Sequence, residues 1–119
     1  MSNSLTNSAY WEALEKHFGE IKNTTIKTLF EKDKNRGTSL LVKDLGIYFD
    51  FAKHRITDET LELLFKLAES RGLERKREAM FSGEKINTTE NRAVLHTALR
   101  APKDSKILVD ACFNSALNI

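Results

Sequence analysis

The stretch TDETLELLFKLAESRG, residues 57–72, decides the fold class of this chain. Its leucines and Phe65 recur three and four residues apart, which is the period of an amphipathic helix. Thr57 suits the N-cap of that helix, and Gly72 suits the left-handed position just past its end. The stretch predicts a helix with one apolar side, in a chain made mainly of helices.

Two helices are predicted on the N-terminal side of this stretch. The first covers residues 8–23, with Ser8 as its N-cap and a stripe of apolar side chains at three- and four-residue spacing. The stripe consists of Trp11, Leu14, Phe18 and Ile21. A shorter helix is predicted over residues 25–33, and residues 34–37 then break the pattern.

Two more helices are predicted on the C-terminal side. Residues 73–81 form the first, which stops at Ser82-Gly83. The second begins at Asn87, which has the three-residue spacing of a capping box to Glu90, and ends at Pro102.

A small β-hairpin is predicted between the two groups of helices. Residues 39–42 form a short apolar run, and residues 45–51 alternate between apolar and other side chains with a period of two. Lys43-Asp44 stands between the runs as the expected turn, without the Asn-Gly signature of tight hairpins. Residues 106–109 fit either a short strand or a loop, and residues 111–119 show no clear periodicity.

Composition excludes several classes of function. The net charge is +2, which is too balanced for a nucleic-acid-binding surface. The single cysteine rules out an internal disulfide. The first eight residues are polar, unlike a signal peptide, and no apolar run approaches the roughly 20 residues that span a bilayer. The expected compartment is the cytoplasm, with neither a membrane nor a nucleic acid as partner.

No catalytic, cofactor-binding or metal-binding residue is predicted from residue type and spacing. Three histidines, His17, His54 and His96, are candidate bases, but their neighbours show neither metal-ligand spacing nor a triad-like order. His17 is expected on a helix surface. His96 is expected inside a helix, in a structural or interface role.

A family resemblance rests on MFSGEKINTTENRAVLHTALR, residues 80–100. This stretch closely resembles one near the start of glucose-6-phosphate isomerases. The resemblance covers roughly residues 10–110, because shorter segments also agree with the family in order. These segments are residues 11–14 with His17 and Phe18, 28–30 with Asp33 and Arg36, 56–61, 99–102 and 108–110.

The resemblance implies an N-terminal segment of an isomerase that interconverts glucose 6-phosphate and fructose 6-phosphate in glycolysis and gluconeogenesis. The implied fold is mainly α with a small β-hairpin, an incomplete part of an α/β sugar-isomerase architecture. The family uses a glutamate base without metal or organic cofactor, and its whole enzymes are homodimers that bind a sugar phosphate. Its glycine-rich loop, Gly-Gly-Arg-Phe-Ser motif and Asp-Gln-x-Gly-Val-Glu motif have no counterpart in these 119 residues. No catalytic residue is therefore carried over, and Arg92 and His96 are assigned to architecture.

Two interpretations of the chain stay open on these grounds. Residues 1–110 are the expected isomerase-like segment and residues 111–119 an unrelated tail. Under the first interpretation the chain is a partial isomerase that is inactive by itself. Under the second it is a small helical protein-interaction module without enzymatic activity, whose partner is another protein such as a full-length isomerase subunit.

Overall fold

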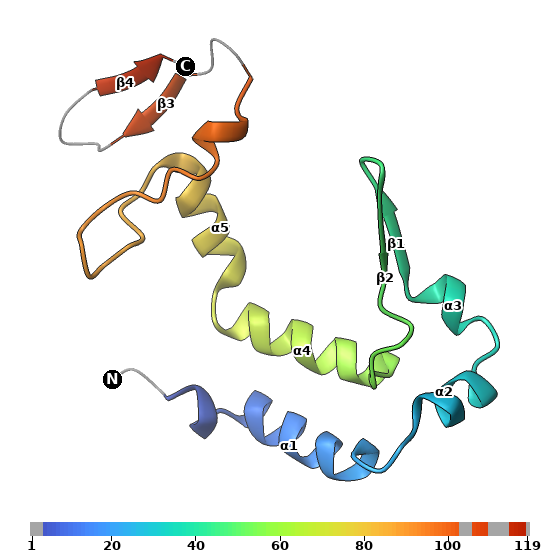
Figure 1. Ribbon diagram of the computed structural model, residues 1–119. Coiled ribbons are helices and arrows are strands. Elements are labelled where there is room, and N and C mark those ends of the chain that lie inside the picture. Colours follow the sequence, from blue (N-terminus) through green and yellow to red (C-terminus); the bar gives the residue numbers. More distant parts are fainter. Residues whose placement is uncertain (1–3, 103–105, 110–114, 119) are drawn as a thin grey trace. The chain divides into compact units, whose positions relative to one another are not determined.

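A computed structural model describes residues 4–102, 106–109 and 115–118. The chain forms two compact units, Met1–Leu67 and Ala68–Ile119. Helices make up most of the described secondary structure, and the strands form antiparallel two-stranded hairpins (Figure 1). This confirms the predicted class, mainly α with a small β-hairpin.

The first unit begins with two helices that confirm the sequence predictions. After a short 3-10 turn, η1 (Leu5–Asn7), helix α1 spans Ala9–Ile21 and helix α2 spans Ile26–Lys32. The Ser8 side chain accepts a hydrogen bond from the Trp11 backbone N–H, and Thr25 accepts one from Thr28 in the same way. Both helices therefore start at side-chain N-caps, which satisfy amide groups that would otherwise lack a partner.

The predicted break at residues 34–37 is only partly correct, because a single helical turn, α3 (Arg36–Ser39), starts inside it. The reason lies in Arg36, a residue that is 3% exposed. Its Nε donates to the Ala52 carbonyl at 2.7 Å, and its terminal nitrogen donates to the carbonyls of His54 and Ile56 at 2.7 and 2.9 Å. The guanidinium thus fixes the loop that leads into the next helix.

The predicted hairpin exists, but its turn lies two residues later than expected. Strand β1 (Leu41–Asp44) pairs antiparallel with β2 (Ile47–Asp50), so that Asp44 faces Ile47 across the turn. Leu45 and Gly46 form the turn with φ of 49° and 78°, the positive values that a tight two-residue hairpin turn needs. Lys43 and Asp44 belong to the strand because the left-handed Leu45-Gly46 pair reverses the chain.

Two longer helices follow, joined by Arg71 and Gly72. Helix α4 spans Asp58–Ser70 and helix α5 spans Leu73–Ser82. Gly72 has a φ of 65° and its N–H bonds to the Glu69 carbonyl, which confirms it as the residue that ends α4. Gly83, with a φ of 79°, ends α5 in the same way.

The helix predicted from Asn87 to Pro102 is wrong. Asn87 and Arg92 form a β-bridge through reciprocal backbone hydrogen bonds of 3.1 Å, and Asn91 between them has a φ of 53°. The Asn87 side chain does accept from the Glu90 N–H, as an N-cap would. The left-handed Asn91 then turns the chain back, so only a short 3-10 turn, η2 (Ala98–Arg100), forms before Pro102.

The C-terminal part contains a second hairpin. Strand β3 (Lys106–Val109) pairs antiparallel with β4 (Ser115–Asn118). Of the two alternatives left open for residues 106–109, the strand is therefore correct. Residues 111–119 show no periodic pattern that predicts a strand, yet β4 occupies residues 115–118. Residues 110–114 are outside the described part of the chain.

Few apolar side chains are buried. Among the described residues, the buried apolar ones are Leu29, Leu40, Ala52 and Ala79. Large aromatic side chains predicted to lie on apolar faces remain open, with Phe18 61% and Phe65 64% exposed. Among the same residues, no helix has the length and apolar character needed to cross a bilayer.

Candidate functional site

His17 is the centre of a polar cluster between α1 and α4. The residue is 4% exposed, so the prediction that it lies on a helix surface is wrong. The residue sits beside the apolar stripe of α1, and the first turn of α4 covers it. Its Nε2 lies 2.7 Å from the Thr60 hydroxyl oxygen, a contact between residues 43 positions apart.

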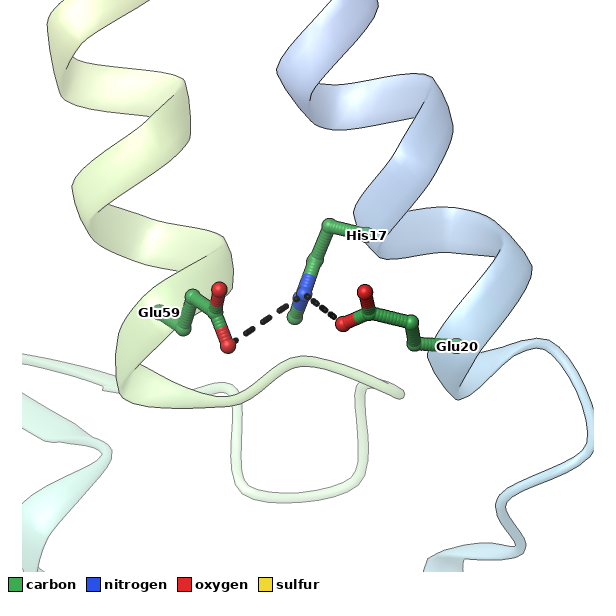
Figure 2. Close-up of side chains that lie close together, drawn as sticks. All are labelled: His17, Glu20 and Glu59. Carbon is green, nitrogen blue, oxygen red and sulfur yellow. Dashed lines mark ion pairs between the residues drawn. The ribbon is translucent and has the colours of Figure 1, made fainter.

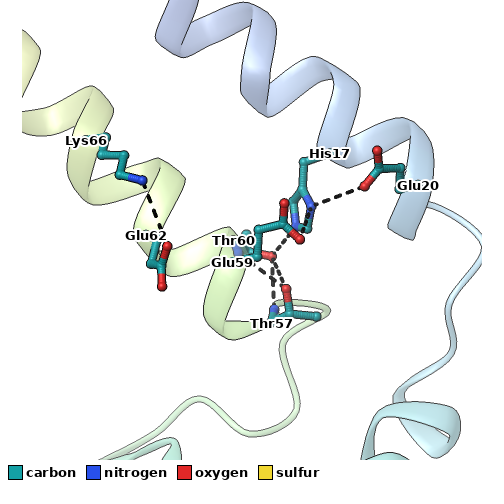
Figure 3. Close-up of polar contacts among 7 residues, drawn as sticks. All are labelled: His17, Glu20, Thr57, Glu59, Thr60, Glu62 and Lys66. Carbon is teal, nitrogen blue, oxygen red and sulfur yellow. Dashed lines mark hydrogen bonds and ion pairs between the residues drawn. The ribbon is translucent and has the colours of Figure 1, made fainter.

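The hydroxyl that meets His17 belongs to the N-terminal cap of α4. The Thr57 N–H donates to Thr60 Oγ1 at 2.9 Å, and the Thr60 N–H donates back to Thr57 Oγ1 at 3.3 Å (Figure 3). This is the reciprocal pattern of a capping box, with threonine in the place of the usual glutamate. The cap holds the Thr60 hydroxyl in one position, and that hydroxyl in turn orients the imidazole.

The other ring nitrogen of His17 is buried and has no hydrogen-bond partner. It points toward two carboxylates, with Glu59 Oε2 at 3.5 Å and Glu20 Oε2 at 4.0 Å from Nδ1 (Figure 2). Both glutamate side chains are largely exposed, at 65% and 55%. The cluster therefore combines one buried nitrogen with two carboxylates that reach it from the solvent side.

Carboxylate, imidazole and hydroxyl follow one another in the cluster, the order found in hydrolase triads. Thr60 is nevertheless unsuited to be a nucleophile, because it is 8% exposed and its oxygen is already bonded to the Thr57 backbone and lies 3.1 Å from the Thr57 hydroxyl. A reacting group has no approach to that oxygen. The arrangement suits positioning of the imidazole rather than acyl transfer.

An apolar groove of about 480 Å³ lies beside the cluster in the first unit. The stripe of α1 forms one wall and the apolar side of α4 the other. The residues that line it are Trp11, Leu14, Glu15, His17, Phe18, Ile21, Arg55, Thr60, Leu64 and Leu67. Such a lining suits apolar side chains far better than it suits a phosphorylated sugar.

The other residues considered from the sequence do not join the cluster. His54 is exposed in the loop before α4, where its carbonyl accepts from Arg36. His96 is also exposed and lies in a turn, so the prediction that it lies inside a helix is wrong. Arg92 closes the turn that starts at Asn87.

Among the described residues, the group with donor atoms close enough for a metal ion is His17 with Glu20 and Glu59.

Sequence reasoning missed the two glutamates. One signal was available, since His17 and Glu20 are three residues apart on one helix and therefore share a face. Glu59 gave none, because its position beside His17 depends on how two helices distant in the sequence pack. Thr60 was missed because a threonine three residues after an N-cap is a less familiar capping partner than glutamate.

Comparison with known proteins gives one consistent result. Residues 50–116, more than half of the chain, match the family model described as Phosphoglucose isomerase. The chain is 54% identical over 110 residues to the glucose-6-phosphate isomerase of Deinococcus deserti (strain VCD115), which is 92% of this chain and 20% of that protein.

Two further relatives have the same name and show the same coverage. Identity is 52% over 106 residues with the glucose-6-phosphate isomerase of Roseiflexus castenholzii, covering 89% of this chain and 20% of that one. It is 50% over 110 residues with that of Mycolicibacterium smegmatis, covering 92% and 20%. The chain thus spans about a fifth of the length of the curated relatives it matches.

Proposed function

Because the chain belongs to the phosphoglucose isomerase family, we propose that it is the N-terminal segment of a glucose-6-phosphate isomerase and that it has no isomerase activity by itself. The whole enzyme would interconvert glucose 6-phosphate and fructose 6-phosphate, in glycolysis and gluconeogenesis, in the cytoplasm. The observation that carries the proposal is the coverage: the match takes in 92% of this chain but 20% of the relative.

The described side chains support the absence of activity. An aldose–ketose isomerase needs a base at the sugar carbons and a cluster of donors for the phosphate. The His17 cluster holds its nitrogen buried and its two carboxylates close together, which repels a phosphate. The neighbouring groove is apolar. Nothing among these groups combines a base with a phosphate-binding site.

The exposed apolar side chains suggest what the segment contributes. Phe18 on α1 and Phe65 on α4 are each more than half exposed, as are Ile47 and Phe49 on the hairpin. Burying one large apolar side chain is worth roughly 1.5–3 kcal/mol. We infer that these surfaces pack against the remaining four-fifths of the isomerase polypeptide and help to hold its catalytic domains in place.

Fragment complementation tests the proposal. The chain is mixed with a Deinococcus deserti isomerase that lacks the segment matched here, and fructose 6-phosphate formation is followed in a coupled assay. We expect no turnover above the blank from either part alone, and measurable turnover from the mixture. Turnover by the chain alone would disprove its inactivity, and failure of the mixture to bind or react would disprove the assigned place in the enzyme.

Matched variants show whether the exposed apolar side chains carry the association. Phe18→Glu places a charge on the α1 stripe. It should weaken the binding of the chain to the shortened isomerase, and the isomerase activity of the mixture should fall at least as much. Lys27→Gln, at a side chain 84% exposed on α2, is the control and should leave both unchanged. Binding of the chain to an intact isomerase in preference to the shortened one would instead favour a non-enzymatic interaction module.

A further inference from the structure

We propose that His17 Nδ1, Glu20 and Glu59 bind a divalent transition-metal ion of the zinc type that links α1 to α4. Two observations lead to this site. The donor atoms of the three side chains all lie within 4.8 Å of one another. Independently, the buried His17 Nδ1 has no hydrogen-bond partner and points between the two carboxylates. This site is separate from any isomerase chemistry.

The hydrogen bonds on the other side of the ring prepare Nδ1 as a ligand. If the Thr60 hydroxyl donates to Thr57 Oγ1, its two lone pairs accept from the Thr57 N–H and from His17 Nε2–H. In that tautomer the bare lone pair of Nδ1 faces two negative carboxylates, an arrangement that a cation bound between them would stabilise. Metal-binding histidines ordinarily donate their second N–H to a fixed acceptor, and Thr60 supplies one here.

The donor set and its spacing fit a zinc-type ion. Imidazole nitrogen and carboxylate oxygen both bind Zn²⁺ at about 2.0–2.2 Å, so neighbouring ligand atoms in a tetrahedral site lie about 3.4 Å apart. Nδ1 is already 3.5 Å from Glu59 Oε2 and 4.0 Å from Glu20 Oε2. Small rotations of two exposed glutamates would close the site. Their two charges neutralise the ion, and water can take the fourth position.

The consequence of binding is mechanical. His17 and Glu20 come from α1, whereas Glu59 comes from the first turn of α4. An ion held by all three therefore binds only when the two helices are packed as they are here. By mass action, a ligand that binds the folded form alone stabilises it, by about 2.7 kcal/mol at a concentration 100 times Kd. The ion would act as a clasp for the first unit.

The test is a titration of the 119-residue chain with Co²⁺, whose absorption spectrum reports tetrahedral coordination, and with Zn²⁺ followed by calorimetry. Cys112→Ser is kept in every sample so that its thiolate does not compete for the ion. We expect one ion per chain at micromolar concentration, together with a rise in the thermal midpoint. Absence of saturable binding would overturn the site, and would indicate that His17 is held by its carboxylates without an ion.

Variants locate the ion. Glu20→Gln and Glu59→Gln alter exposed side chains, so the fold should persist while affinity falls about ten-fold or more for each. The matched controls are Glu62→Gln, on the same helix as Glu59, and His96→Gln. Both change exposed side chains outside the site, so the affinity for the ion should stay within about two-fold. Binding that survives the Glu20→Gln/Glu59→Gln double variant would overturn the proposal, whatever its affinity.

The hydroxyl of Thr60 provides a second readout. Thr60→Ser keeps the acceptor for Nε2–H and should retain binding, whereas Thr60→Val removes it and should weaken binding about 10–100-fold. Circular dichroism of both variants separates loss of the ligand arrangement from loss of α4. Equal affinity in the serine and valine variants would show that the imidazole is not positioned in the way proposed.

Discussion

Arg36 Nε donates a hydrogen bond of 2.7 Å to the carbonyl oxygen of Ala52, and both residues are almost completely buried. The guanidinium also donates to the carbonyls of His54 and Ile56, so it binds every second carbonyl of one loop. That loop leads directly into α4 and the Thr57 cap. The position of Glu59 and Thr60 therefore depends on a side chain more than 20 residues earlier.

Replacing Arg36 by lysine should release this loop. A lysine ammonium cannot donate through the planar fork that serves three carbonyls, and it leaves buried acceptors without partners. We expect the free energy of local unfolding to fall by about 3 kcal/mol. Trypsin measures this, because Lys53 and Arg55 lie within the loop and cleavage there should become faster.

Arg77→Lys is the control for that experiment. Arg77 pairs with Glu74 on the exposed side of α5, and exposed ion pairs contribute about 0–1 kcal/mol. Cleavage after residues 53 and 55 should keep its original rate in this variant. Equal acceleration by both lysine substitutions would show that Arg36 has no special part in holding the loop.

Loss of the α4 cap is expected to fray the first turn of that helix. Thr57→Ala removes the oxygen that accepts from the Thr60 N–H, at a cost of about 1 kcal/mol. Hydrogen exchange at residues 58–61 should accelerate accordingly. Thr57→Ser keeps the oxygen and should retain the original protection. If serine and alanine behave alike, the cap does not stabilise α4.

The hairpin turn offers a stabilising substitution. Leu45 has a φ of 49°, so its backbone is strained, and its side chain is 92% exposed, so little burial offsets that strain. Leu45→Asn creates the Asn-Gly pair that such turns favour and should stabilise the hairpin by about 1 kcal/mol. Exchange of the β1 and β2 amides measures the gain.

A branched residue at the same position should act in the opposite direction. Leu45→Val keeps an apolar side chain but crowds the left-handed backbone, and hairpin protection should fall. Together the two substitutions separate backbone strain from side-chain polarity. Similar protection in the asparagine and valine variants would contradict an energetic role for the turn.

The chain by itself should unfold over a broad temperature range. Whole domains have net stabilities of about 5–15 kcal/mol, and each large apolar side chain left open forfeits roughly 1.5–3 kcal/mol of that. Differential scanning calorimetry should show a shallow transition, and hydrophobic dyes should bind the chain. A sharp, reversible transition in a monodisperse sample would contradict this.

Sequence periodicity and capping predicted most of the helices. Ser8, Thr25 and Thr57 begin helices where local side-chain-to-backbone bonds satisfy the first amides. Gly72 and Gly83 end them by adopting backbone angles that other residues avoid. These signals lie within a few residues of each other, so no knowledge of the tertiary structure is needed to read them.

Local signals failed where two structures share the same first contact. Asn87 accepts from the Glu90 N–H in a hairpin turn as it would at a helix N-terminus, and the left-handed Asn91 decides between them. The His17 cluster could not be predicted for a different reason. Glu59 and Thr60 reach His17 only through the packing of α1 against α4, which spacing along one helix does not reveal.

The β1–β2 hairpin has a further consequence for handling this chain. The two strands satisfy each other's backbone groups on one side only, so in the described part of the chain each has an outer edge with free amides and carbonyls. Ile47, Tyr48 and Phe49 of β2 are exposed, and the unpaired edge of a strand with exposed apolar side chains is a template for another strand. Concentrated solutions of the chain should therefore be prone to strand-by-strand polymerisation that begins at β2.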